Sequence, residues 1–216
     1  MAKKPHTFEG KKHSVSWDKR LCIHVGECGR AKGALFEAGR KPWCDPDLAD
    51  TEEAAHVVQA CPSGALVHVD VDGNPILEPA PDNAAHIAND GPVYLTGDLS
   101  IKGAADDMPG VKRRAALCRC GASKNKPFCD NSHREIGFKD AGAIGETGAE
   151  LAEADGELAV QSFQDGPLEL KGNLTMYAGS GRKAWQGRKV YLCRCGASNN
   201  KPFCDGSHKD AGFKAD

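Results

Sequence analysis

Two stretches of the sequence each place three cysteines and one histidine within sixteen residues. The first is CRCGASKNKPFCDNSH at 118–133, and the second is CRCGASNNKPFCDGSH at 193–208. Thiolates and neutral imidazole are ligands of borderline and soft metals. The sequence therefore predicts two metal sites, with the ligands Cys118, Cys120, Cys129 and His133 in the first and Cys193, Cys195, Cys204 and His208 in the second.

The spacing of these ligands distinguishes three kinds of chemistry. Structural zinc sites usually place about two to four residues between their first two ligands, but here a single residue separates them. Disulfides fit less well, because an odd number of cysteines in each stretch leaves one unpaired. An iron–sulfur cluster with three thiolates and one imidazole fits best, because Cys-x-Cys suits two ligands on one iron and Cys-x3-His suits the other.

The two stretches belong to a longer internal repeat. A shift of 75 residues aligns them without a gap, and 25 of the 50 residues at 90–139 are identical to their partners at 165–214. Identity at this level, in variable positions as well as at the cysteines, indicates duplication of a whole module. We therefore expect the two copies to have the same fold.

The order Cys-x-Cys-x2-Ser-x3-Pro-x-Cys-Asp-Gly-Ser-His resembles the CDGSH iron–sulfur family of the mitoNEET type, whose members carry 2Fe-2S clusters. The second copy matches throughout, whereas the first has Asn131 where the family has glycine. Asparagine tolerates left-handed backbone angles, so we expect a site in both copies. The resemblance implies two 2Fe-2S clusters held by the eight ligands above. Because the family forms homodimers with exchanged strands, it also implies a pseudo-twofold unit folded from one chain.

A third candidate site lies in the N-terminal region, where Cys22-x5-Cys28 is followed by Cys61 and a proline. Bacterial ferredoxins use Cys-x2-Cys-x2-Cys with a distant Cys-Pro, and Val25 stands where the second cysteine would be. The region resembles the single-cluster ferredoxins, and especially the divergent mono-cluster domain found beside CDGSH modules. The resemblance implies cluster ligation by Cys22, Cys28 and Cys61.

Val25 leaves the type of this third cluster open. Three thiolates suit a 3Fe-4S cluster, whereas a 4Fe-4S cluster needs a fourth ligand. Cys44 and His24 are the candidates for that ligand. A lone cysteine beside a tryptophan is more often a small buried hydrophobe, and a histidine that flanks a cluster loop more often lies at the surface or near the ligands.

Short strands and one longer helix are expected to position these sites. Residues that favour extended chain predict strands at 92–97, 114–120, 167–177 and 189–195, and a further strand before Cys22. Asp50 and Glu53 resemble a capping box that opens a helix at 51–60. The residues after Cys129 and Cys204 predict a short helix, with Asp130 or Asp205 as the N-cap.

These elements predict an α+β fold. We expect a small ferredoxin-like domain at 1–78 and a mostly β pseudo-twofold unit, made of a first CDGSH repeat at 79–144 and a second at 145–216. The internal symmetry predicts a monomer.

The composition narrows the functional classes. The 28 basic and 30 acidic residues nearly balance, which argues against nucleic-acid binding. No apolar run reaches the roughly 18 residues that span a bilayer, and the N-terminus lacks the apolar segment of a secretory signal. Ten cysteines then favour metal binding in a reducing cytoplasm over disulfides.

The same features predict a protein that is not an enzyme. The sequence has no phosphate-binding glycine loop, no nucleophile elbow and no paired-carboxylate motif. The resemblance implies electron transfer with a redox partner protein. The alternative is an iron–sulfur cluster carrier that serves an apo-acceptor protein, or a redox or pH sensor, because a histidine ligand can be protonated near neutral pH.

Overall fold

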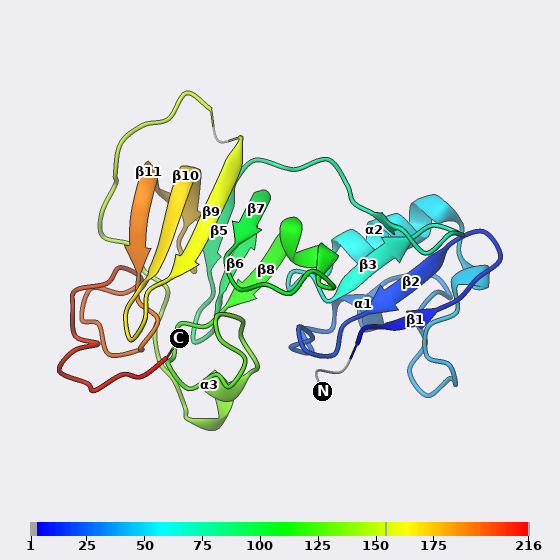
Figure 1. The fold of residues 1–216 in the computed structure, drawn as a ribbon, viewed down its shortest axis with the longest axis horizontal. Coiled ribbons are helices and arrows are strands. Elements are labelled where there is room, and N and C mark those ends of the chain that lie inside the picture. Colours follow the sequence, from blue (N-terminus) through cyan, green and yellow to red (C-terminus); the bar gives the residue numbers. More distant parts are fainter. Residues whose placement is uncertain (1–3, 154, 216) are drawn as a thin grey trace.

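The computed structural model describes residues 4–153 and 155–215, and within them the strands form a four-stranded and a seven-stranded sheet (Figure 1). The four-stranded sheet is antiparallel, in the order β1-β2-β3-β4. Its strands are β1 (His6–Phe8), β2 (Ser14–Trp17), β3 (Leu66–Val69) and β4 (Pro75–Ile76). The strand predicted before Cys22 is confirmed as β2.

Three short helices accompany this first sheet. They are α1 (Glu27–Arg30), a 3-10 helix (Pro46–Leu48) and α2 (Thr51–Gln59). The prediction that Asp50 caps α2 is confirmed, because its carboxylate accepts a hydrogen bond of 2.8 Å from the backbone N–H of Glu53. The buried face of α2 packs into a core with β2 and β3, and this packing holds α2 in place just before Cys61.

The seven-stranded sheet contains both copies of the repeat. Its strands are β5 (Ala84–Ile87), β6 (Val93–Thr96), β7 (Asp98–Ile101), β8 (Arg114–Leu117), β9 (Glu157–Ser162), β10 (Leu168–Tyr177) and β11 (Lys183–Leu192). The order is β7-β9-β10-β5-β6-β8, and β11 also pairs with β10 (strands labelled in Figure 1). A 3-10 helix (Pro109–Lys112) precedes β8, and α3 (Ser132–Glu135) follows it. The four strands predicted in this region are confirmed as β6, β8, β10 and β11. However, β8 and β11 end at Leu117 and Leu192, before the cysteines that the predicted strands at 114–120 and 189–195 included.

The pairing of the strands repeats at the 75-residue offset. β5 pairs with β6 in the same antiparallel register in which β9 pairs with the first half of β10. The parallel pair Ser100–Ala159 joins β7 to β9, and its counterpart Thr175–Ala84 joins β10 to β5. Each copy therefore contributes a strand that pairs with the other copy, and the two copies share one hydrophobic core.

The short helix after the ligand stretch differs from the prediction. In the first copy the N-cap of α3 is Asn131, and Asp130 lies one residue earlier, where its carboxylate accepts hydrogen bonds from the N–H and hydroxyl of Ser132. In the second copy residues 207–212 form turns instead of a helix. The N-cap predicted at Asp130 is therefore one residue too early, because Asn131, with its left-handed backbone, lies directly before α3. The helix predicted after Cys204, with Asp205 as its N-cap, is wrong. Among the described residues, the helices lack the length and apolar character needed to cross a membrane.

Candidate metal centres

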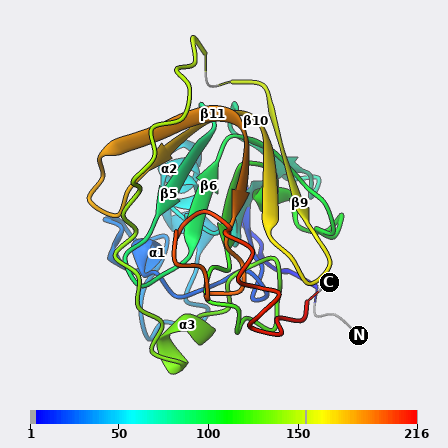
Figure 2. The same ribbon diagram turned by 90° about the vertical axis from the view of Figure 1, so that its left-hand side faces the viewer.

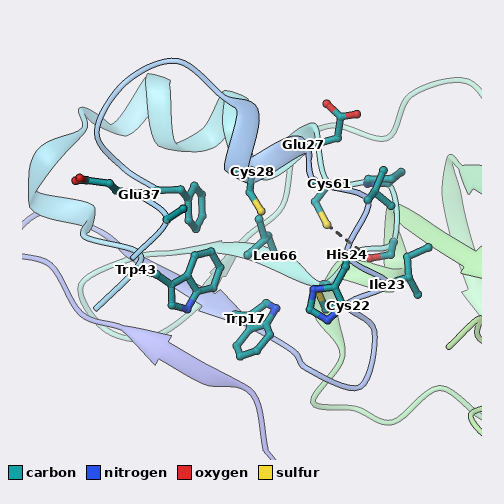
Figure 3. A pocket seen from close by; sticks show the side chains of 18 residues that line it. Trp17, Cys22, Ile23, His24, Glu27, Cys28, Glu37, Trp43, Cys61 and Leu66 are labelled. Carbon is teal, nitrogen blue, oxygen red and sulfur yellow. Dashed lines mark hydrogen bonds between the residues drawn. The ribbon is translucent and has the colours of Figure 1, made fainter. Parts of the chain in front are cut away.

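Cys22, Cys28 and Cys61 line a single cavity of about 440 Å³ in the N-terminal domain (Figure 3). The loop after β2 carries Cys22, α1 carries Cys28, and the residue Cys61 follows α2. Tertiary structure thus brings together three thiols that span 40 residues of sequence. The rest of the wall is mostly apolar, and its large side chains are Trp17, Phe36, Trp43 and Leu66.

The chemistry of this cavity fits an iron–sulfur cluster. Burial raises the pKa of the Cys28 thiol, and the neighbouring Cys61 and Cys22 raise it further. Three thiolates in one apolar cavity repel one another unless a cation compensates their charge. Metal binding supplies that charge and deprotonates the thiols.

The two candidates for a fourth ligand lie in different places. His24 lines the cavity, and its Nδ1 is 4.0 Å from the Sγ of Cys22. Cys44 does not line the cavity. It is fully buried in the core beside α2, where burial raises its pKa to about 12. Val25 is in the cavity wall, at the position where ferredoxins have a cysteine.

The first CDGSH stretch forms a loop after β8. The Sγ atoms of Cys118 and Cys120 are 3.8 Å apart, and the Sγ of Cys129 is 3.4 Å from the Nδ1 of His133. All four side chains are buried. Asn131 has the left-handed backbone that the sequence predicted for it, with φ of 74°. The stretch thus brings two sulfurs together, and a sulfur and an imidazole together, as the spacing predicts.

The second stretch has nearly the same geometry after β11. The Sγ atoms of Cys193 and Cys195 are 3.7 Å apart, and the Sγ of Cys204 is 3.4 Å from the Nδ1 of His208. Only Cys193 is buried here, and the other three ligands are half-buried.

The candidate ligands of the two CDGSH stretches come together in pairs and not in complete sets. Within residues 4–153 and 155–215, no three histidine, cysteine or acidic side chains are grouped closely enough to hold one metal ion.

Several residues that shape these loops were not singled out from the sequence. Arg119, between the first two cysteines, is buried and donates to the backbone carbonyls of Gly91 (2.9 Å) and Ala88 (2.6 Å). Its counterpart Arg194 makes the equivalent bonds 75 residues later. The sequence does contain a sign of this role, because both copies of the repeat have arginine between the first two cysteines.

The motif aspartate and serine close the same turns in both copies. The carboxylate of Asp130 accepts from the N–H of Lys124, and that of Asp205 accepts from the N–H of Asn199, each at 2.8 Å. The serine hydroxyl of each Gly-Ala-Ser turn donates to the carbonyl of the motif phenylalanine. These residues fix the loop in which the ligands lie.

The two CDGSH loops touch each other (Figure 2). Gly121 and Gly196 follow the Cys-x-Cys pairs and have φ of 84° and 81°. A Cβ on Gly121 would collide with the carbonyl of Cys195, and a Cβ on Gly196 would collide with the carbonyl of Cys120. The backbones therefore approach closely because both residues are glycine.

The N-terminal ligand loop (residues 18–28) and Cys61 contact the first CDGSH copy through four hydrogen bonds among the described residues. They are Arg20 Nη2 to Asp107 Oδ1 (2.9 Å), Arg114 Nε to Cys61 O (2.9 Å), Asn125 Nδ2 to Arg20 O (2.7 Å) and Asn131 Nδ2 to Ile23 O (2.7 Å). Ile23 also packs with Ala116 and Cys129 in a small buried cluster. The cavity of the N-terminal domain is thus adjacent to the first CDGSH stretch.

Comparison with known proteins agrees with the three sites. Residues 8–71 match the family described as divergent 4Fe-4S mono-cluster, and residues 90–134 and 165–209 match the family described as iron-binding zinc finger CDGSH type. Two curated relatives, both named Uncharacterized protein YjdI, come from Escherichia coli K12 and O157:H7. Each is 42% identical over 59 residues, which cover 27% of this chain and 78% of the relative.

These matches define an iron–sulfur protein. The chain belongs to the CDGSH iron–sulfur family, with two CDGSH domains that follow a divergent mono-cluster domain. Both resemblances inferred from the sequence are confirmed. The assignment of individual ligands stays a prediction.

Proposed function

We propose that the chain is an electron-transfer protein with two 2Fe-2S clusters and one ferredoxin-type cluster, and with no catalytic activity of its own. One observation carries the proposal: the three sets of candidate ligands lie next to one another in a row. The N-terminal loop packs on the first CDGSH stretch through Ile23, and the first stretch touches the second through Gly121 and Gly196. Such a row suits the passage of electrons from one centre to the next.

The ligand sets also favour a direction of flow. Bound clusters supply reversible one-electron chemistry, and their potentials depend on ligand type, hydrogen bonds and burial. The N-terminal set offers only thiolates within one apolar cavity, whereas each CDGSH set includes a histidine, which raises the potential. We therefore propose that electrons enter at the N-terminal domain and leave to a partner protein at the second CDGSH site, whose ligands are the more exposed.

For the N-terminal cluster we propose the 3Fe-4S form, held by Cys22, Cys28 and Cys61. Cys44 lies outside the cavity, and Val25 occupies the position of the missing thiolate. The 4Fe-4S form named by the matching family needs a fourth ligand, for which His24 is the side chain in reach.

The fold supports two further proposals. The reciprocal parallel pairs Ser100–Ala159 and Thr175–Ala84 favour a pseudo-twofold unit within a monomer. The antiparallel sheet with α2 packed on it favours a ferredoxin-like N-terminal domain. We place the protein in the cytoplasm, because its many free thiols suit a reducing compartment.

Metal analysis of protein purified without oxygen tests this proposal first. Two 2Fe-2S clusters and one 3Fe-4S cluster give about seven iron atoms per chain, and a 4Fe-4S cluster would give about eight. A redox titration should then reduce all centres reversibly without loss of iron. Colourless protein with about three zinc atoms would contradict the proposal, since each of three ligand sets would then hold one zinc ion.

Substitution Val25→Cys tests the type of the N-terminal cluster. The oxidised parent should give the paramagnetic signal of a 3Fe-4S centre, and the variant should convert it into a 4Fe-4S centre, because it completes the ferredoxin ligand set. Val71→Cys is the matched control, since Val71 is exposed and lies outside this cavity. Loss of the parent signal in Cys44→Ser would instead make Cys44 a ligand.

A cluster carrier or sensor is the alternative function. It is favoured by the half-buried ligands of the second site, from which a cluster could pass to an acceptor protein. Mixing the loaded protein with an apo-ferredoxin distinguishes the two functions. Transfer faster than loss to a chelator favours the carrier, and retention of iron through repeated reduction favours electron transfer.

A further inference from the structure

Asn131 and Gly206 are counterparts in the two CDGSH stretches, and both have a left-handed backbone, with φ of 74° and 92°. Glycine adopts this conformation without strain, whereas a residue with a Cβ is destabilised there. The backbone alone therefore favours glycine at both positions. The presence of asparagine in the first copy therefore needs an explanation from contacts of its side chain.

That side chain reaches the N-terminal domain. The Nδ2 of Asn131 donates to the carbonyl of Ile23 over 2.7 Å and across 108 residues of sequence. A backbone carbonyl is only an acceptor, so the contact fixes which end of the amide faces Ile23. The backbone N–H of Asn131 also points to the Sγ of Cys129, at 3.4 Å. Asn131 thus connects the residue after Cys22 to a ligand of the first CDGSH site.

Apolar packing reinforces this hydrogen bond. Ile23 is only 3% exposed and packs with Cys129 and Ala116, next to the partly buried Tyr94. Ile23 lies at the edge of the N-terminal cavity that faces the seven-stranded domain (Figure 3). Burial of Ile23 lowers the local dielectric on one side of the hydrogen bond, which strengthens the bond.

The arrangement is retained at a cost in stability. The Oδ1 of Asn131 is buried and has no hydrogen-bond partner within the described parts of the chain. An unsatisfied buried acceptor destabilises the folded state. Glycine would avoid both this cost and the backbone strain, so the hydrogen bond to Ile23 is the contact that explains the side chain.

We propose that Asn131 is a positioning residue that holds the N-terminal ligand loop against the first CDGSH site and couples the two centres through Cys22, Ile23 and Cys129. This inference rests on the proposed electron-transfer function. One electron leaves the N-terminal centre, which is oxidised, and reaches the first CDGSH centre, which is reduced. No covalent bond forms or breaks, and a one-electron protein reductant replaces the electron.

The second copy provides a matched control. Gly206 has open space around its Cα, and no described atom would lie within 4 Å of an added Cβ. The counterpart of Asn125, Asn200, bonds to the carboxylate of Glu146 instead of the N-terminal loop. The exchange Gly206→Asn therefore adds the same side chain where no N-terminal domain faces it.

The test uses the full chain, purified without oxygen and matched for iron content. Electron paramagnetic resonance measures the magnetic interaction between the N-terminal centre and the reduced first CDGSH centre, which depends on their separation and orientation. Loss of one net hydrogen bond in Asn131→Gly should lower the ratio of docked to undocked loop by about two- to tenfold. The magnetic interaction should weaken accordingly, and transfer between the two centres after flash reduction should slow. Gly206→Asn should change neither.

Asn131→Asp provides a second variant, because it keeps the size and left-handed tendency of asparagine but lacks the donor for Ile23. It should lose the interaction as Asn131→Gly does. Parent-like magnetic interaction in both variants, or an equal loss in Gly206→Asn, overturns the positioning role. If the variants lose the interaction but the parent passes no electron, the positioning role stands and the relay is wrong.

Discussion

The two CDGSH sites have nearly the same internal geometry but different surroundings. The four ligands of the first site are buried, with His133 only 7% exposed, whereas Cys195, Cys204 and His208 of the second are half-buried. The N-terminal domain covers the first site, and its contacts involve Ile23 and Asn131. The repeat therefore sets the ligand geometry, while the neighbouring domain sets how far solvent reaches the ligands.

One pair of equivalent residues helps to explain why the N-terminal domain packs on the first site and not on the second. Ala116 in β8 is buried against Ile23, and its counterpart in β11 is Tyr191, which is 40% exposed. A small residue lets the N-terminal loop approach the first copy. The tyrosine keeps the second copy from offering the same surface.

The largest expected difference between the sites is their loss of iron in acid. Burial lowers the pKa of His133, and the nearby Arg134 and Arg119 lower it further, although Asp130 opposes them. A lowered pKa keeps this imidazole neutral, and able to bind iron, to a more acidic pH. We expect the second site to lose its cluster first as the pH falls, which absorption and paramagnetic spectra would follow. Loss of the first cluster before the second would contradict the comparison.

Exchange of the half-buried histidine of the second site, His208, should reduce that difference. His208→Cys replaces an imidazole that acid can protonate and adds a negative charge beside the iron. The second cluster should therefore survive to lower pH, and its potential should fall. His133→Cys is the matched control, for which we expect a similar fall in potential and a smaller gain in acid stability. Unchanged acid stability in both variants would remove histidine from the ligand sets.

The contact between the two loops should contribute to folding stability. Gly121→Ala places a methyl group against the carbonyl of Cys195 and strains a left-handed residue, which should lower the free energy of unfolding by about 2–4 kcal/mol. Gly137→Ala is the control, because Gly137 has a similar φ and open space around it, so only the strain of about 1–2 kcal/mol applies. Urea unfolding measures both. Equal losses would mean that the loops do not pack as described.

The smallest expected effect concerns one exposed charge. Lys124 follows the motif serine in the first copy, and Asn199 stands there in the second. A nearby ammonium favours the reduced, more negative cluster, but an exposed lysine is screened by salt. Lys124→Asn should therefore bring the two 2Fe-2S potentials slightly closer, as measured by redox titration at low salt. A gap that stays the same would make Lys124 a surface charge only.

Local patterns in the sequence determined much of this protein. The Cys-x-Cys and Cys-x3-His spacings bring their side chains together within a single loop or turn, so the pairs at 3.4–3.8 Å could be predicted without the fold. The strands of the repeat and the Asp50 cap also follow from neighbouring residues. The match at a fixed offset predicted that both copies would have the same fold, and the structure adds that their strands pair in the same register.

Contacts between distant residues were decided by the tertiary structure. The sequence left Cys44 open as a ligand, and only packing against α2 removes it from the cavity of Cys22, Cys28 and Cys61. From the sequence, Asn131 is only a residue that tolerates a left-handed backbone, because its partner Ile23 lies 108 residues away. Full burial of one ligand set and partial burial of the other depend on how whole domains pack. The spacing of residues along the sequence does not determine that packing.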